Sequence, residues 1–162
     1  MIFLDLGSNL QREQSLRSAL SALERSFKVK RRSAVYESPP YPPGSQQPCF
    51  FNLAVEIETA LPPAQLRGRL RELEAELGRR RSADKLAART IDLDLTLYHD
   101  RVERHEDWEL PHPQVASQCF VLVPLVELEP ELVHPVLQVP LRELLERVAH
   151  GPEHIWRSDF RP

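Results

Sequence analysis

Residues 79–98, RRRSADKLAARTIDLDLTLY, contain a basic segment followed by an alternating apolar and acidic segment. Apolar and polar residues alternate over residues 90–98, which predicts a β-strand with one face packed on a core. The apolar face consists of Ile91, Leu93, Leu95 and Leu97. Asp92 and Asp94 share the other face, and the two-residue repeat places their Cα atoms roughly 6.6 Å apart. Two carboxylates at this spacing can hold a shared pair of divalent cations.

The first half of this stretch is strongly basic. Its charged residues are five cations and one acid, an excess of four positive charges: Arg79, Arg80, Arg81, Lys85, Arg89 and Asp84. Guanidinium groups bind phosphate through paired hydrogen bonds, so acids beside arginines suggest a site for metal and phosphate. A simpler alternative is a half-buried strand with its acids in solvent, next to a solvated basic loop.

The composition indicates one globular domain. A chain of 162 residues supports one core better than two, and its 41% hydrophobic and 28% charged content is typical of soluble proteins. The net charge of −3 argues against general binding to nucleic acid or to anionic membranes. No apolar segment has the length of a membrane span, and the first residues lack the basic start of a signal peptide. We therefore expect a monomeric, cytoplasmic protein with a single domain over residues 1–162.

The periodicity predicts strands over residues 2–6, 29–37, 50–58 and 90–98 and helices over residues 11–26 and 63–77. Their sequence, β-α-β-β-α-β, is typical of a ferredoxin-like antiparallel sheet with both helices on one face. Helical turns over residues 120–128 and a helix over residues 140–148 would add a layer on the other face, giving a three-layer α/β/α sandwich. Five prolines predict an irregular loop over residues 38–48, and residues 152–162 are expected to be a loosely attached tail.

Other polar residues have more than one interpretation when each is taken alone. Gly7, Ser8 and Asn9 form an ordinary strand-to-helix turn and not a Walker loop, since no Gly-Lys-Ser/Thr follows. Glu74 on the second helix can face solvent or a ligand. His112, between two prolines, suits metal or phosphate but is more often structural. Asn52 needs a hydrogen-bond partner if it is buried, and a planar heterocycle would supply one.

Several short motifs follow one another along residues 4–148. They are Gly-Ser-Asn-Leu, Tyr36-x-Ser-Pro-Pro, Gln47-Pro-x-Phe-x-Asn52, Glu74 with Gly-Arg-x-Arg, Arg89-x-x-Asp-Leu-Asp, Pro-His-Pro and Phe-Val-Leu-x-Pro-Leu-x-Glu. This ordered set resembles the 6-hydroxymethyl-7,8-dihydropterin pyrophosphokinase family of folate biosynthesis. The resemblance implies an ATP-dependent diphosphotransferase with a ferredoxin-like core and two Mg²⁺ ions. It would transfer the β,γ-pyrophosphoryl group of ATP to the pterin hydroxymethyl group and release AMP.

The resemblance also implies roles for particular residues. Asp92 and Asp94 would bind both Mg²⁺ ions, and Arg79 and Arg89 would be the catalytic arginines. The ATP side would consist of Glu74, Arg81, Lys85, His112 and Gln118. The pterin side would consist of Ser38, Pro39, Pro40, Tyr41, Phe50, Asn52 and Phe120. No general base stands out, and a magnesium ion could instead lower the pKa of the attacking hydroxyl.

The chain departs from the family pattern at a few positions. Leu86 and Ala88 stand where many relatives have tryptophan and proline, Thr96 replaces an aliphatic residue, and Gln118 stands where a phosphate-binding arginine is common. Two other classes are alternatives: an RNA-binding or non-catalytic ferredoxin-like module, and a glycosyltransferase that uses D-x-D. The first lacks paired RNP aromatic motifs and the second lacks a nucleotide-binding α/β repeat, so both are disfavoured.

Overall fold

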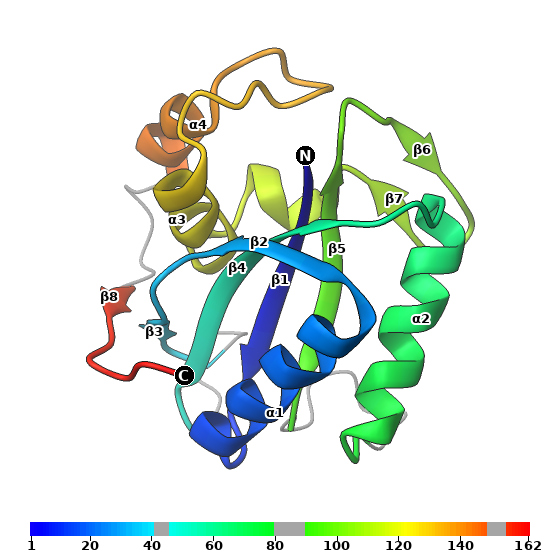
Figure 1. Cartoon of the computed structure of the whole chain (residues 1–162). Coiled ribbons are helices and arrows are strands. Elements are labelled where there is room, and N and C mark those ends of the chain that lie inside the picture. The colour runs from blue at the N-terminus through cyan, green and yellow to red at the C-terminus, as the bar shows by residue number, and fades with distance from the viewer. Residues whose placement is uncertain (41–45, 80–89, 149–154) are drawn as a thin grey trace.

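An antiparallel sheet runs through the centre of the molecule with helices on both of its faces (Figure 1). The computed structural model describes residues 1–40, 46–79, 90–148 and 155–162. The sheet consists of β1 (Ile2–Ser8), β2 (Lys28–Arg32), β3 (Tyr36–Ser38), β4 (Phe50–Glu58), β5 (Asp92–Tyr98) and β8 (Trp156–Arg157). The helices are α1 (Arg12–Ser26), α2 (Pro63–Glu76), the 3-10 helix η1 (Pro113–Ala116), α3 (Cys119–Leu128) and α4 (Leu141–Val148). A small hairpin pairs β6 (Glu103–Arg104) with β7 (Glu109–Leu110).

The strand order confirms the ferredoxin-like prediction. The sheet runs β5-β1-β4-β3-β8, with β2 also paired to β4, so the fourth predicted strand lies beside the first and the third beside the second. The first core lies between this sheet and the helices α1 and α2. Its members include Leu4, Leu6, Leu16, Leu20, Leu23, Leu53, Val55, Leu66, Leu70 and Leu73. The leucines of both helices recur every three or four residues, which places them on the sheet side of each helix.

A second core on the opposite face completes the three layers. Phe3 from β1, Ala54 from β4 and Leu97 from β5 pack against residues of α3 and α4. The segment expected to form short helical turns is a continuous helix, α3, that accommodates Pro124. Within the described parts of the chain, every helix is too short or too polar to cross a membrane.

The predicted alternation of β5 is wrong at Leu97. Leu93 and Leu95 face the first core, but a register shift between β1 and β5 turns Leu97 to the second core. Thr96 lies at this irregularity, fully buried, and its hydroxyl donates to the carbonyl of Phe3 at 2.8 Å. A bulge inserts one residue on one strand and so exchanges the faces beyond it. The two acids precede the bulge and keep the predicted common face.

The predicted strand over residues 29–37 is two strands, β2 and β3, interrupted at residues 33–35. Ser33 fills the interruption, since its hydroxyl accepts a hydrogen bond from the Ala54 amide at 3.0 Å. The side chain thus replaces a backbone acceptor and lets both short strands pair with β4.

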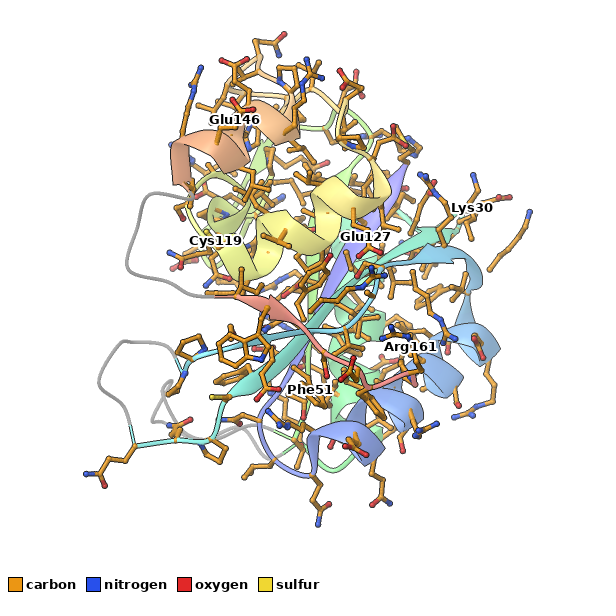
Figure 2. All side chains as sticks on the ribbon, turned by 90° about the vertical axis from the view of Figure 1, so that its left-hand side faces the viewer. Lys30, Phe51, Cys119, Glu127, Glu146 and Arg161 are labelled. Carbon is orange, nitrogen blue, oxygen red and sulfur yellow. The ribbon has the colours of Figure 1, made fainter. Side chains whose placement is uncertain are left out.

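The last residues differ from the expected loose tail. β8 pairs with β3, and the Phe160 ring stacks on Phe51 of β4 with centroids 5.4 Å apart. The guanidinium of Arg12 lies 3.9 Å from the centroid of the Phe51 ring. In Figure 2 this segment runs between α3 and α1, with Arg161 near the labelled Phe51 and β8 on the side of Glu127. The sequence did not indicate this because one aromatic residue in a short polar segment has no periodicity.

Candidate active site

The two acids of β5 lie on the α3/α4 face of the sheet, where the second core ends. The register places Asp94 opposite Asp5 of β1, and Asp92 opposite Gly7. On its other side, Gly7 pairs with Asn52 of β4. Directly opposed residues in antiparallel strands project from the same face. An acid, a glycine and an amide therefore form one row across three strands.

Gly7 leaves the middle of this row without a side chain. A Cβ atom added at Gly7 would lie 3.8 Å from Asn52 Oδ1, 3.9 Å from Asp92 Cβ and 4.0 Å from the Phe50 ring. Neighbouring strands are about 4.8 Å apart, so the backbones of Asp92 and Asn52 are separated by about 10 Å. Gly7 thus contributes no side chain to the surface between the acidic side and the amide side, which we call the floor of the site.

Arg79 and Glu74 form a buried ionic group with Asp92. Gly78, whose φ is +83°, follows the end of α2 in the left-handed region that favours glycine, and Arg79 comes directly after it. The Arg79 guanidinium donates to the carboxylates of both Glu74 and Asp92, and the amide of Leu93 donates to Glu74 Oε1 at 2.8 Å. Glu74 therefore faces Arg79 and the start of β5, and only 3% of its side chain is exposed.

Burial and the neighbouring charges shift the pKa values of Glu74 and Arg79. Burial raises the pKa of Glu74, while the Leu93 amide and Arg79 act in the opposite direction. Burial alone would lower the pKa of Arg79, but the carboxylates of Asp92 and Glu74 raise it overall. Arg79 therefore stays a cation, held between two carboxylates.

Asp5 is a buried acid opposite Asp94 that the sequence motifs did not indicate as a candidate for the site. Only 8% of it is exposed, and its Oδ1 atom has no hydrogen-bond partner among the described residues. Burial, followed by repulsion from Asp94 and Asp92, raises its pKa well above the ordinary value. The signal was the acid at the centre of the apolar segment IFLDLG, which alternation places on the same face as Gly7.

The amide side of the row is built from β3 and β4. Asn52 is 3% exposed, and its Nδ2 atom donates to the Ser38 hydroxyl at 2.9 Å. The protein itself therefore supplies one partner for this buried amide, and Asn52 Oδ1 lies on the side of Gly7. Phe50 and Phe120 are half-buried, with Phe120 packed against the second core.

His112 and Gln118 are both held near the start of α3. His112 precedes η1, its Nδ1 faces the amide of Gln114 at 3.4 Å, and burial lowers its pKa. The negative charge of Asp92 acts in the opposite direction on this pKa. Gln118 occupies the N-cap position of α3 without a side-chain capping hydrogen bond, and its Oε1 is buried without a partner in the described regions.

Some predicted site residues have no described placement, and others lie at the surface. Tyr41, Arg81, Lys85 and Arg89 fall outside the described residues. Pro39 is exposed and Pro40 half-buried, just after β3. Over residues 1–40, 46–79, 90–148 and 155–162, no three His, Cys, Asp or Glu side chains come close enough to hold one metal ion. The structure thus joins the acids, Arg79, Glu74 and Asn52 around one end of β1.

These features define a class of enzyme. Paired acids beside a fixed arginine, on a ferredoxin-like sheet, are typical of a metal-dependent transferase acting on phosphate groups. The chain matches the family model of 7,8-dihydro-6-hydroxymethylpterin-pyrophosphokinase (HPPK) over residues 3–130. It therefore belongs to the HPPK family and is an enzyme of the diphosphotransferase class. This membership decides against the RNA-binding and glycosyltransferase alternatives.

Curated relatives agree with this assignment over most of the chain. It is 34% identical over 143 residues to the 2-amino-4-hydroxy-6-hydroxymethyldihydropteridine pyrophosphokinase of Aquifex aeolicus, covering 88% of each protein. It is 35% identical over 150 residues to the enzyme of the same name from Haemophilus influenzae, covering 91% of this chain and 92% of that protein. The folic acid synthesis protein fol1 of Pneumocystis carinii is 36% identical over 151 residues, which are 91% of this chain but only 20% of that protein.

Solved structures support the fold. A Plasmodium falciparum HPPK-DHPS crystal structure with pteroate matches 90% of this chain and 42% of its own, with a TM-score of 0.72 and 16% identity. The chain thus spans less than half of that protein and about nine tenths of the bacterial relatives.

Proposed function

We propose that this chain transfers the β,γ-pyrophosphoryl group of ATP to the hydroxymethyl group of 6-hydroxymethyl-7,8-dihydropterin. The products would be AMP and the pterin diphosphate, within folate biosynthesis. Family membership and the names of two bacterial relatives that align along nearly their whole length support this reaction and ATP as its co-substrate. A monomeric state and a cytoplasmic location stay predictions.

The observation that carries the proposal is the row formed by Asp92, Gly7 and Asn52. A pyrophosphokinase must hold a charged triphosphate and a flat heterocycle close enough for one hydroxyl to reach the β-phosphorus. Here the acid and the amide lie on one face with only a glycine between them. The hydroxymethyl group would lie over Gly7, with the ring on the Asn52 side and the phosphates on the Asp92 side.

The acids Asp92 and Asp94 fit two Mg²⁺ ions. Magnesium prefers oxygen ligands and commonly binds through one or two carboxylates together with substrate phosphates. Both acids come from one strand face, and Asp5 adds a buried carboxylate oxygen beside them. Magnesium held there would neutralise phosphate charge and lower the pKa of the attacking hydroxyl.

Arg79 would stabilise negative charge on the transferred group. Its guanidinium is bound to two carboxylates, one from Asp92 on β5 and the other from Glu74 on α2. When Asp92 binds cations, Glu74 would still hold Arg79 at the phosphate side. Arg81, Lys85 and Arg89 would add charge there, joined by His112 and Gln118.

The pterin would lie against β3 and β4. Ser38 orients Asn52 by accepting from its Nδ2 atom, which leaves the amide oxygen directed along the row towards Gly7. That oxygen can accept from the amino or ring N–H groups of the pterin, and aromatic faces can stack on the ring. The further residues proposed for this side are Pro39, Pro40, Tyr41, Phe50 and Phe120.

One assay tests the reaction. The chain is incubated with ATP, Mg²⁺ and the hydroxymethyl pterin, and the nucleotides are separated. AMP formed in step with loss of free pterin is expected, whereas ADP or no turnover would overturn the proposal. Asp94→Ala should lower turnover by more than about 100-fold, because it removes a direct metal ligand, while circular dichroism stays unchanged. Normal turnover by this variant would refute the metal assignment.

A further inference from the structure

Asp5 is a buried acid that the proposed reaction does not yet use. It lies on β1 between Phe3, which belongs to the second core, and Gly7 at the floor of the site. Directly opposed residues in antiparallel strands have Cβ atoms roughly 5 Å apart, so its carboxylate is a close neighbour of Asp94. Its buried Oδ1 has no hydrogen-bond partner in the described structure.

A structural role alone does not explain this placement. Buried polar atoms are nearly always hydrogen-bonded. A carboxylate oxygen without a partner at the boundary of an apolar core destabilises the folded state. The other buried acids of the described chain do have partners: Glu56 pairs with Arg31 at 2.6 Å, and Glu74 accepts from the Leu93 amide. Asp5 instead has an unused acceptor oxygen, on the strand face that also carries the acid pair.

We propose that Asp5 is a positioning residue that binds the cations of this site through their water ligands. Magnesium releases its water reluctantly and usually keeps several bound molecules, which donate hydrogen bonds to nearby carboxylates. Since no three acidic, histidine or cysteine side chains in the described regions approach closely enough to bind one ion together, Asp5 binds through water and not directly.

This inference rests on the proposed cation site, so the experiment must separate the two. Mn²⁺ binding to the full chain without nucleotide is measured by calorimetry and by the paramagnetic resonance of free Mn²⁺. Four variants are compared with the wild type: Asp5→Asn, Asp5→Ala, Asp94→Asn and Glu56→Gln. The last one removes a buried acid charge from the same sheet, away from the acid pair, and should bind Mn²⁺ as the wild type does.

We expect Asp94→Asn to abolish binding and both Asp5 variants to weaken it by about tenfold or more, the range found for residues behind metal ligands. The role of Asp5 alone would be overturned if the Asp5 variants bound Mn²⁺ within roughly twofold of the wild type while Asp94→Asn bound none. Unchanged binding by Asp94→Asn, or none by the wild type, would overturn the cation site itself. Equal losses in the Glu56 and Asp5 variants would also refute the role of Asp5. Asp5→Ala keeps the test decisive if Asp5→Asn does not fold.

Discussion

Replacement of Glu74 by alanine should destabilise the fold far more than its place on a surface helix suggests. The substitution leaves the Leu93 amide without its 2.8 Å acceptor and removes one of the two carboxylates bound by Arg79. Removing one partner of a buried ion pair costs about 3–5 kcal/mol. Glu74→Gln keeps an oxygen for the Leu93 amide and should cost less, about 1–3 kcal/mol.

Urea unfolding followed by circular dichroism measures these differences. Glu72→Ala is the matched control on the same helix, because the Glu72 side chain is 66% exposed and pairs only with Arg69 among the described residues. It should change the free energy of unfolding by no more than about 0.5 kcal/mol. Equal losses for the Glu74 and Glu72 alanine variants would refute the argument that Glu74 is a buried anchor for Arg79.

Three further predictions concern other parts of the molecule. Phe160→Ala should lower the free energy of unfolding by about 1–3 kcal/mol in urea titrations, because it loses the stacking on Phe51. The control Arg161→Ala should lower it by less than about 0.5 kcal/mol. Equal effects of the two variants would show that the C-terminal segment is loosely attached. Burial lowers the pKa of His134 in the folded chain, so below pH 6.5 the unfolded chain binds a proton that the folded chain does not. The wild type should therefore lose stability on acidification by up to about 1.4 kcal/mol per pH unit more than His134→Asn, and parallel pH profiles in urea titrations would contradict this. Gly7→Ala should fold, because its added Cβ meets neighbours no closer than 3.8 Å. Gly7→Val should also fold but should lose about 100-fold in turnover, because its side chain fills the floor of the site. Full activity of the valine variant would refute the placement of the hydroxymethyl group.

Much of the fold followed from periodicity because its signals are local. The leucines of α1 and α2 recur at helical spacing, and Pro63 begins α2 as expected. Asp92 and Asp94 share a face as predicted, since they precede the bulge that displaces Leu97. The bulge escaped prediction because it depends on the partner strand β1, which sequence spacing does not describe.

Contacts between distant segments could not be predicted in the same way. Phe160 has no sequence neighbour that indicates stacking on Phe51, and Asn52 gives no sign that Ser38 accepts from it. Both contacts close long loops, and their geometry is set by the order of strands in the sheet.

The sequence by itself determined the ferredoxin-like order, the acid pair on one strand face and the ordered motifs that resemble the HPPK family. These depend on residue type and spacing along one segment, where side-chain direction follows the two-residue or 3.6-residue repeat. Only the tertiary structure decided that Asp5 lies opposite Asp94, that Gly7 separates Asp92 from Asn52, and that Glu74 holds Arg79. The physical reason is that strand register is fixed by packing the whole sheet, and register decides which distant side chains become neighbours.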